Sequence, residues 1–271
     1  MKPTQPKYEV FTIGFQRIEL LEKRKTSYIY VLAAIISVPD YTKQFKKQMD
    51  WRFNTIWFEQ INQTKFHQQD FKTKYKSADN FAKAEYAILW HFKQSGLSFD
   101  SLTPSDKLLY LELNWANILN LLAIERFENL KRLELHYCTK LESDIGIETL
   151  KNTIEFLHIN QSKKFTFTKN LLELKKLKVL RLNSCAPIDN LKFLKNFPNL
   201  IDFRFVNTNV IDGDLTPIIK HPTIRTVGLS NKRHYNFTDS QLENELNLKS
   251  TVEYKDYVYK GQYQTFRYNY E

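Results

Sequence analysis

Apolar residues recur at a nearly fixed spacing along the middle of the chain. Six nine-residue segments carry them at positions 1, 4 and 6, and these segments begin at Leu108, Leu130, Ile154, Leu177, Leu200 and Ile224. Successive segments therefore start 22, 24, 23, 23 and 24 residues apart. A period held over six units indicates an internal structural repeat.

Each unit divides into a strand and a return. Positions 4 and 6 alternate with polar neighbours, which is the period of a strand with one face on a core. The intervening stretches, such as residues 124–130 and 191–200, have helical spacing. One unit cannot bury its apolar side alone, so neighbouring units are expected to stack and to align their strands as a parallel sheet.

Residues from about 105 to 240 resemble the bacterial leucine-rich repeat family through this LxxLxLxx pattern. The resemblance implies an α/β fold, a leucine-rich repeat solenoid with its parallel sheet on the concave face. The family usually carries asparagine at position 9, where this chain has Ala116, Cys138, Ser162, Cys185, Thr208 and Lys232. Small or hydroxylated residues can fill that turn, and Lys232 is expected to mark the last coil.

The division expected along the chain has three parts. Residues 1–100 lack the repeat and suit an N-terminal α+β capping region or small domain, and residues 101–247 form a solenoid of about six coils. In the first part, Tyr8–Leu20 and Ser27–Ser37 suit the strands of a hairpin. Met49–Ile61 is rich in apolar and aromatic residues, but no period distinguishes strand from helix there.

A helix is predicted from Ala78 to Ser95, because apolar residues in this stretch follow helical spacing. Ser77 can cap its start and Gly96 can end it. Such a helix would cover the apolar end of the first coil, since the end of a repeat stack requires a cover.

The tail, residues 248–271, predicts a C-terminal β-hairpin cap. Two alternating, tyrosine-rich stretches meet near Lys260 and Gly261, which suits a turn. The rings are expected to pack on the last coil, and a partner-binding surface is the alternative.

Positions 3, 5 and 8 of each segment leave the core and form columns across the concave face. Position 5 changes from acidic Glu112 to basic Arg204, a gradient that suits a partner of opposite pattern. Aromatic residues and arginine, which dominate interface hot spots, gather on the early coils. The candidate partner-binding residues are Tyr110, Glu112, Trp115, Arg132, Glu134, Tyr137, Phe156, His158, Arg181 and Arg204. The alternative is that the N-terminal region folds over this surface and buries the rings.

Catalytic and cofactor sites find little support in the sequence. It contains no GxSxG, HExxH, Walker or GxGxxG motif, so we predict no catalytic residue and no cofactor. His136 and His158 lie on neighbouring predicted strands with Glu134 nearby, but two histidines without a clear third ligand make a weak metal site. We therefore predict no metal. An enzyme with an unrecognised domain in residues 1–100 remains an alternative.

The net charge of +10 raises nucleic acid as a partner. Residues 1–100 hold 16 Lys and Arg against 10 Asp and Glu, so 16 − 10 = +6 of this excess precedes the repeats. Its basic groups are short and suit solvated surface, so nucleic acid is the less favoured partner and a protein the favoured one.

The cysteines and the apolar runs bear on the compartment. Cys138 and Cys185 occupy one repeat column two coils apart, roughly 10 Å, which is too far for a disulfide and suits a reducing cytoplasm. The longest apolar run, Tyr28–Val38, is too short to span a bilayer, and no secretory signal is visible, so no membrane association is expected. The oligomeric state is left open.

Together these observations predict a cytoplasmic, non-catalytic scaffold for protein–protein interaction. Repeat folds of this kind provide surface rather than chemistry. An immunity or inhibitor protein that masks a toxin or effector is the specific hypothesis, made by analogy.

Overall fold

The computed structural model describes residues 48–73, 75–76, 80–249 and 254–269. All of them belong to one compact unit, Asp40–Glu271. The predicted strands Tyr8–Leu20 and Ser27–Ser37 lie outside the described residues.

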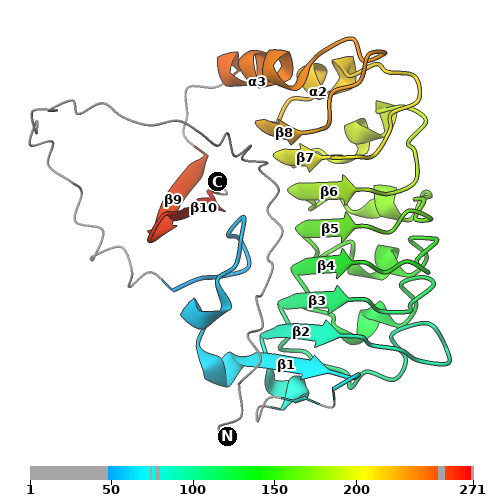
Figure 1. The fold of residues 1–271 in the computed structure, drawn as a ribbon, viewed down its shortest axis with the longest axis vertical. Helices are drawn as coiled ribbons and strands as arrows, with labels where there is room; N and C mark the ends of the chain where they lie inside the picture. Colours follow the sequence, from blue (N-terminus) through cyan, green and yellow to red (C-terminus); the bar gives the residue numbers. More distant parts are fainter. Residues whose placement is uncertain (1–47, 74, 77–79, 250–253, 270–271) are drawn as a thin grey trace, which may run out of the picture. The chain divides into compact units, whose positions relative to one another are not determined.

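Eight parallel strands form one open sheet in chain order (Figure 1). They are β1 (Phe66–Asp70), β2 (Tyr86–Trp90), β3 (Tyr110–Asn114), β4 (Arg132–His136), β5 (Phe156–Asn160), β6 (Val179–Asn183), β7 (Asp202–Arg204) and β8 (Thr226–Gly228). Each strand returns to the next through a coil of the repeat. This architecture is the leucine-rich repeat solenoid expected from the sequence.

The register agrees with the repeat at every predicted strand. The position-4 residues pair in order across the sheet: Leu111, Leu133, Leu157, Leu180, Phe203 and Val227. They lie on the core side of the sheet, where the main apolar cluster joins them to residues of the returns such as Ile124, Leu150 and Leu194. The prediction that stacking builds the core is confirmed.

The returns carry short helical turns. Most are 3-10 turns: η4 (Ile124–Arg126), η5 (Ile147–Leu150), η6 (Leu171–Glu173) and η7 (Lys192–Asn196), and the seventh coil has α2 (Thr216–Lys220). At position 9, Cys138, Ser162 and Thr208 are buried, as expected for small residues that fill a turn. None of the helices in the described ranges is long and apolar enough to cross a membrane.

The sheet begins two strands before the first predicted repeat. The helix predicted from Ala78 to Ser95 is wrong, because that stretch contains the 3-10 turn η3 (Phe81–Lys83) and the strand β2. In β2, Ala87 and Leu89 face the main core, whereas Tyr86 and Ile88 pack in a second apolar cluster on the opposite face. A strand buried on both faces is a continuous apolar run, which also satisfies helical spacing.

The first strand carries no leucine signature. In β1, His67 and Gln69 occupy the columns that hold Leu111 and Leu113 in β3. The end strand of the stack therefore places polar groups at core positions, and the repeat pattern does not reveal it.

A helix covers the other end of the sheet. The helix α3 (Asp239–Leu248) packs on β8 and on α2, with Leu242 and Leu246 buried. Thr238 and Gln241 form a reciprocal capping box at its start, a local sequence signal that fixes where the helix begins.

The predicted C-terminal hairpin is present as β9 (Lys255–Lys260) and β10 (Tyr263–Tyr268). It does not simply extend the last coil, because Tyr268 packs against Phe156 and Val179 in the middle of the sheet. At the other end of the sheet, the 3-10 turns η1 (Phe58–Gln60) and η2 (Gln63–Lys65) come directly before β1 in the chain.

Candidate binding surface on the concave face

The inner face of the sheet is formed by the side chains at positions 3, 5 and 7, which point away from the main core. Position 3 runs Tyr110, Arg132, Phe156, Val179, Asp202 and Thr226. Position 5 runs Glu112, Glu134, His158, Arg181, Arg204 and Gly228, as the sequence predicted. The inner face therefore carries charged and aromatic groups beside one another.

Residues 49–61, here called the strap, cover one part of this face. Met49, Phe53, Ile56 and Ile61 of the strap are buried in an apolar cluster that also includes Tyr110. The cluster fills the inner face over the first strands of the sheet.

Arg132 ties the strap to β4. Its Nη1 donates to the carbonyl oxygens of Trp51, at 2.8 Å, and Phe53, and its Nη2 donates to that of Asn54 at 3.2 Å. Its Nε donates to Glu134 Oε1 at 2.6 Å. The guanidinium thus satisfies strap carbonyls and a buried carboxylate together, which only a planar, multidentate donor can do.

A second buried ion pair ties the hairpin to β6 and β7. Arg181 Nη2 donates to Asp202 Oδ2 at 2.8 Å and to the Tyr268 hydroxyl at 2.9 Å. Asn54 Oδ1 of the strap also lies within hydrogen-bond distance of this nitrogen, and the Tyr268 hydroxyl donates to Asp202. Arg204 adds a second positive charge, with its Nε 2.9 Å from Asp202 Oδ1.

This network shifts the ionisation of its members. Burial alone would raise the pKa of Asp202, but the charges of Arg204 and Arg181 outweigh it and lower that pKa to about 2. Burial and the negative charge of Asp202 hold the pKa of Tyr268 well above its usual range. Asp202 therefore stays ionised and Tyr268 stays protonated through the neutral range.

A histidine pair surrounds the carboxylate of Glu134. His136 Nε2 lies 2.9 Å and His158 Nδ1 3.2 Å from Glu134 Oε2, and the two imidazole rings meet edge to face at 4.9 Å. Burial would raise the pKa of Glu134, yet the Arg132 charge and the two histidine hydrogen bonds hold it well below its usual range. Burial lowers the pKa of His158 to about 4, so this ring is neutral at physiological pH.

The ten residues proposed from sequence are divided by exposure. Tyr110, Arg132, Glu134, Phe156 and Arg181 are buried. Glu112, Tyr137, His158 and Arg204 are half-buried, and Trp115 is 42% exposed. The strap and the hairpin thus cover the position-3 part of the predicted patch. For the strap, this arrangement is the alternative stated above, in which the N-terminal region folds over the surface and buries the rings. The sequence did not anticipate the hairpin in that role.

Position 8 holds an unusual run of left-handed backbone. His91, Trp115, Tyr137, Gln161, Ser184 and Asn207 have φ between 51° and 57°. In this conformation their backbone amides extend the ladder, as with Trp115 N–H to the His136 carbonyl at 2.9 Å. Non-glycine residues are uncommon there, and asparagine is the usual exception.

Three rings of this column form a continuous pile, here called the aromatic stack: His91, Trp115 and Tyr137. The Trp115 ring stacks on His91 with centroids 5.5 Å apart and on Tyr137 with centroids 5.0 Å apart. Trp90 leans on the same indole at 5.4 Å. Both faces of the indole are covered, so its edge is the part that solvent and a partner can reach. The sequence pointed to Trp115 and Tyr137 but missed His91, because the strand before it was not recognised.

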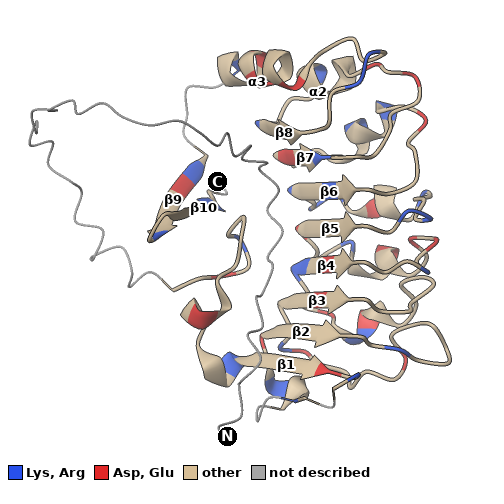
Figure 2. Ribbon diagram, in the orientation of Figure 1, with Lys and Arg blue, Asp and Glu red and all other residues tan. Residues whose placement is uncertain are grey.

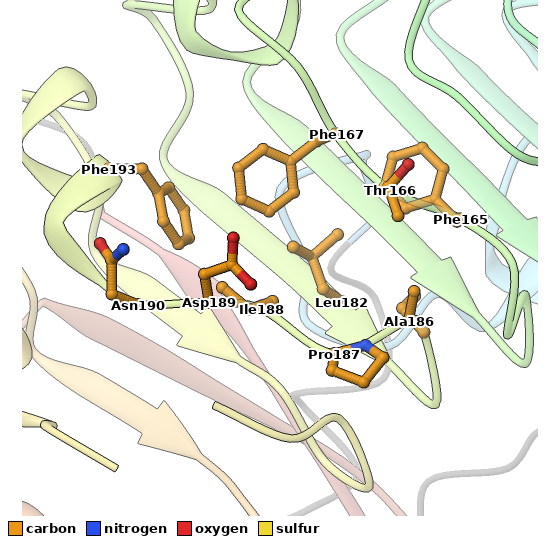
Figure 3. Close-up of a pocket in the computed structure, with 11 residues that line it drawn as sticks. Phe165, Thr166, Phe167, Leu182, Ala186, Pro187, Ile188, Asp189, Asn190 and Phe193 are labelled. Carbon is orange, nitrogen blue, oxygen red and sulfur yellow. The ribbon is translucent and has the colours of Figure 1, made fainter. Parts of the chain in front are cut away.

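A separate pocket of about 310 Å³ opens between the return that follows β5 and the return that follows β6 (Figure 3). Phe167 and Phe193 lie beside it with ring centroids 4.7 Å apart, and Thr166, Asp189 and Asn190 are polar residues of its lining. Cys185 also lines it, but burial raises the pKa of that thiol to about 12, which opposes a nucleophilic role. Nothing in its lining pairs a nucleophile with a base.

Both cysteines are free thiols and buried, as expected from their separation in the repeat. Acidic and basic residues are interspersed over the described coils, with Arg132 at the start of β4 and Asp202 at the start of β7 (Figure 2). The basic excess noted in the sequence therefore does not concentrate on the described strands.

Comparisons with known proteins complete the description. No family model matches the chain, and no curated protein matches it. Among solved structures, the chain is similar to an internalin from Listeria monocytogenes, at 14% sequence identity and a TM-score of 0.42. The alignment covers 59% of this chain and 49% of the internalin chain, so this chain spans about half the length of that protein.

Proposed function

We propose that this chain is a non-catalytic scaffold that binds a partner protein through the open part of its concave side, with the aromatic stack at the centre of the contact. The observation that carries the proposal is Trp115, a 42% exposed tryptophan held in left-handed backbone between two stacked rings. Asparagine or glycine would occupy that backbone at lower free energy. The cost of placing tryptophan there supports a functional role for the ring.

A pre-stacked ring is well suited to binding. Trp115 and Tyr137 are fixed by their ring contacts before a partner arrives, so little side-chain entropy remains to be lost. Tryptophan, tyrosine and arginine are the residue types most enriched among interface hot spots. Glu112 and Arg204 are half-buried neighbours that add charge to the rim, and His158 is a half-buried polar neighbour.

The buried members of the patch act in this proposal through structure rather than direct contact. Arg132 and Arg181 hold the strap and the hairpin on the inner face, and Tyr110 and Phe156 pack beneath them. The strap and the hairpin of β9 and β10 then serve as covers of the sheet rather than as independent binding elements.

The specific role proposed within this class is an inhibitor or immunity protein of the bacterial leucine-rich repeat family, which masks a toxin or effector in the cytoplasm. A masking protein needs a rigid surface and no chemistry of its own, which a repeat scaffold supplies. The family assignment is supported by the repeat pattern of residues 105–240.

The test is affinity capture with three forms of the full chain: wild type, the double variant Trp115→Asn with Tyr137→Asn, and the control Tyr263→Ala. Asparagine suits the left-handed backbone, so the double variant removes rings while keeping the turns. Tyr263 is 65% exposed on the hairpin and provides a ring loss elsewhere.

We expect wild type and the control to retain one partner protein, and the double variant to lose it while it still unfolds in one cooperative transition. Retention of the same partner by the folded double variant contradicts the proposal. Retention of the wild type on heparin at low salt, with a steep salt dependence, would instead favour a nucleic-acid partner.

A further inference from the structure

Three potential metal-binding atoms converge on the inner face. Glu134 Oε2 receives hydrogen bonds from His136 Nε2 and His158 Nδ1, and these three atoms all lie within 4.8 Å of one another. Glu134 pairs with His158 across β4 and β5, and His136 follows two residues along β4 on the same face. The sheet itself therefore fixes the positions of all three side chains.

The outer atoms of the same groups are already held. Arg132 Nε binds Glu134 Oε1, which leaves Oε2 directed at the histidines. Asn160 Nδ2 lies 3.3 Å from His136 Nδ1, and Asn183 Nδ2 lies 3.2 Å from His158 Nε2. Outer hydrogen bonds of this kind orient metal-binding imidazoles and fix their tautomers, and a side-chain amide can present either its oxygen or its nitrogen.

Two N–H groups directed at one carboxylate oxygen resemble the proton-bound form of a three-ligand metal site. A dication in place of these two protons would meet two imidazole nitrogens and one carboxylate oxygen. Each ring proton moves to the opposite nitrogen, where the oxygen of Asn160 or Asn183 accepts it after the amide turns over. Both ring protons therefore keep an acceptor when the ion is bound.

The side chains of His136 and His158 are 16% and 12% exposed, so part of each residue borders solvent. The nearest cation, Arg132, is already paired. The positive charge of Arg132 opposes the binding of a cation beside it, but its guanidinium is hydrogen-bonded to Glu134 Oε1 and to strap carbonyls.

We propose that Glu134, His136 and His158 bind one first-row transition-metal dication of the zinc class, with water in the fourth position. Imidazole nitrogen with one carboxylate suits Zn²⁺ and Co²⁺, whereas Mg²⁺ and Ca²⁺ prefer oxygen ligands throughout. The site is independent of the aromatic stack, and its test does not require a partner protein.

The experiment titrates the chelator-treated full chain with Zn²⁺ by calorimetry and with Co²⁺ by visible absorption. We expect one equivalent to bind, with Co²⁺ bands of a low-coordinate nitrogen and oxygen site. His136→Asn and His158→Asn should each weaken binding by at least about 100-fold, and Asn183→Ala by about tenfold, the effect of an outer-sphere partner. The control His234→Asn, outside the cluster, should bind as wild type.

A second measurement needs no variant. Zn²⁺ should protect His136 and His158 of the wild type from diethylpyrocarbonate, read by mass spectrometry, and leave the modification of His234 unchanged. Absence of a one-to-one complex in the wild type overturns the proposal. So does Zn²⁺ binding of unchanged affinity in the folded histidine variants, or equal protection at all three histidines.

Discussion

The guanidinium carbon of Arg132 lies 3.7 Å from the centroid of the Phe156 ring, its register partner on β5. The guanidinium carbon of Arg181 lies 4.9 Å from the same centroid, so two buried arginines contact one aromatic ring. Such cation–π contacts gain strength when they are desolvated. The centre of the inner face is therefore held by charge on aromatic rings as well as by ion pairs.

Arg132→Met should destabilise the fold by about 3–5 kcal/mol, because it leaves the Glu134 carboxylate buried without its main counter-charge and frees three strap carbonyls. Urea denaturation of the variant measures the loss. Hydrogen exchange should also accelerate at strap amides. The same change at exposed Arg233 is the control and should shift the midpoint little. Equal stability of the two variants would contradict the role assigned to Arg132.

Asp202 should make the protein lose stability in acid. Its pKa of about 2 in the folded chain lies below the ordinary value of 3.8, so the folded state binds this proton more weakly than the unfolded state. The stabilisation is complete above the ordinary pKa and disappears as the pH falls from about 4 toward 2. The size is about 2 kcal/mol, from a shift of nearly two units in a fully buried group.

Denaturation midpoints measured between pH 2 and pH 7 test this expectation. Asp202→Asn should be less stable at neutral pH and should show a shallower decline below pH 4 than wild type. Asp106, whose side chain is 62% exposed, provides the control Asp106→Asn, which should follow the wild-type curve. A decline of the same steepness in Asp202→Asn would assign the acid sensitivity to other groups.

The repeat positions could be predicted from the sequence because stacking imposes them locally. Leu111 and Leu133 pair in the sheet at the spacing that the pattern gave. The first two strands could not be predicted in this way. His67 lies at a core position of β1, and Tyr86 of β2 is buried on the inner face of the sheet, which the strap covers. Coils with such residues have no periodic signature.

The columns of the inner face were also predictable, but their covers were not. Arg132 binds the carbonyl of Phe53, 79 residues earlier, and Tyr268 binds Asp202, 66 residues earlier. Contacts at such sequence separations leave no mark on local periodicity. The sequence alone therefore listed Tyr110, buried under the strap, beside Trp115, which is exposed.

Gly146→Ala should cost about 3 kcal/mol or more. Gly146 has φ of 102°, and an added Cβ would lie 2.3 Å from the Leu121 carbonyl oxygen of the preceding coil. Backbone strain and overpacking each contribute about 1–3 kcal/mol at such a position. Gly261→Ala is the matched control, because its φ is 57° and nothing lies within 4 Å of the added atom.

The control should therefore lose only the left-handed backbone preference, about 1–2 kcal/mol. Thermal or urea denaturation of the two variants compares them directly. If Gly146→Ala lost no more stability than Gly261→Ala, the close approach of neighbouring coils at Leu121 would be excluded.

Trp115→Asn should lower the free energy of unfolding by no more than about 2 kcal/mol, although it removes the largest exposed ring of the concave side. The loss of stacking on His91 and Tyr137 costs about 0.5–1.5 kcal/mol per ring pair. Relief of the left-handed backbone returns about 1–2 kcal/mol, because asparagine tolerates φ near 55°. Leu113→Ala, on the strand β3 that precedes Trp115, is the contrast and should cost about 2–5 kcal/mol, because Leu113 is wholly buried. Chemical denaturation of both variants measures the difference. A loss at Trp115→Asn as large as that at Leu113→Ala would show that the ring stabilises the fold. The proposal that Trp115 occupies left-handed backbone in order to bind a partner would then be contradicted.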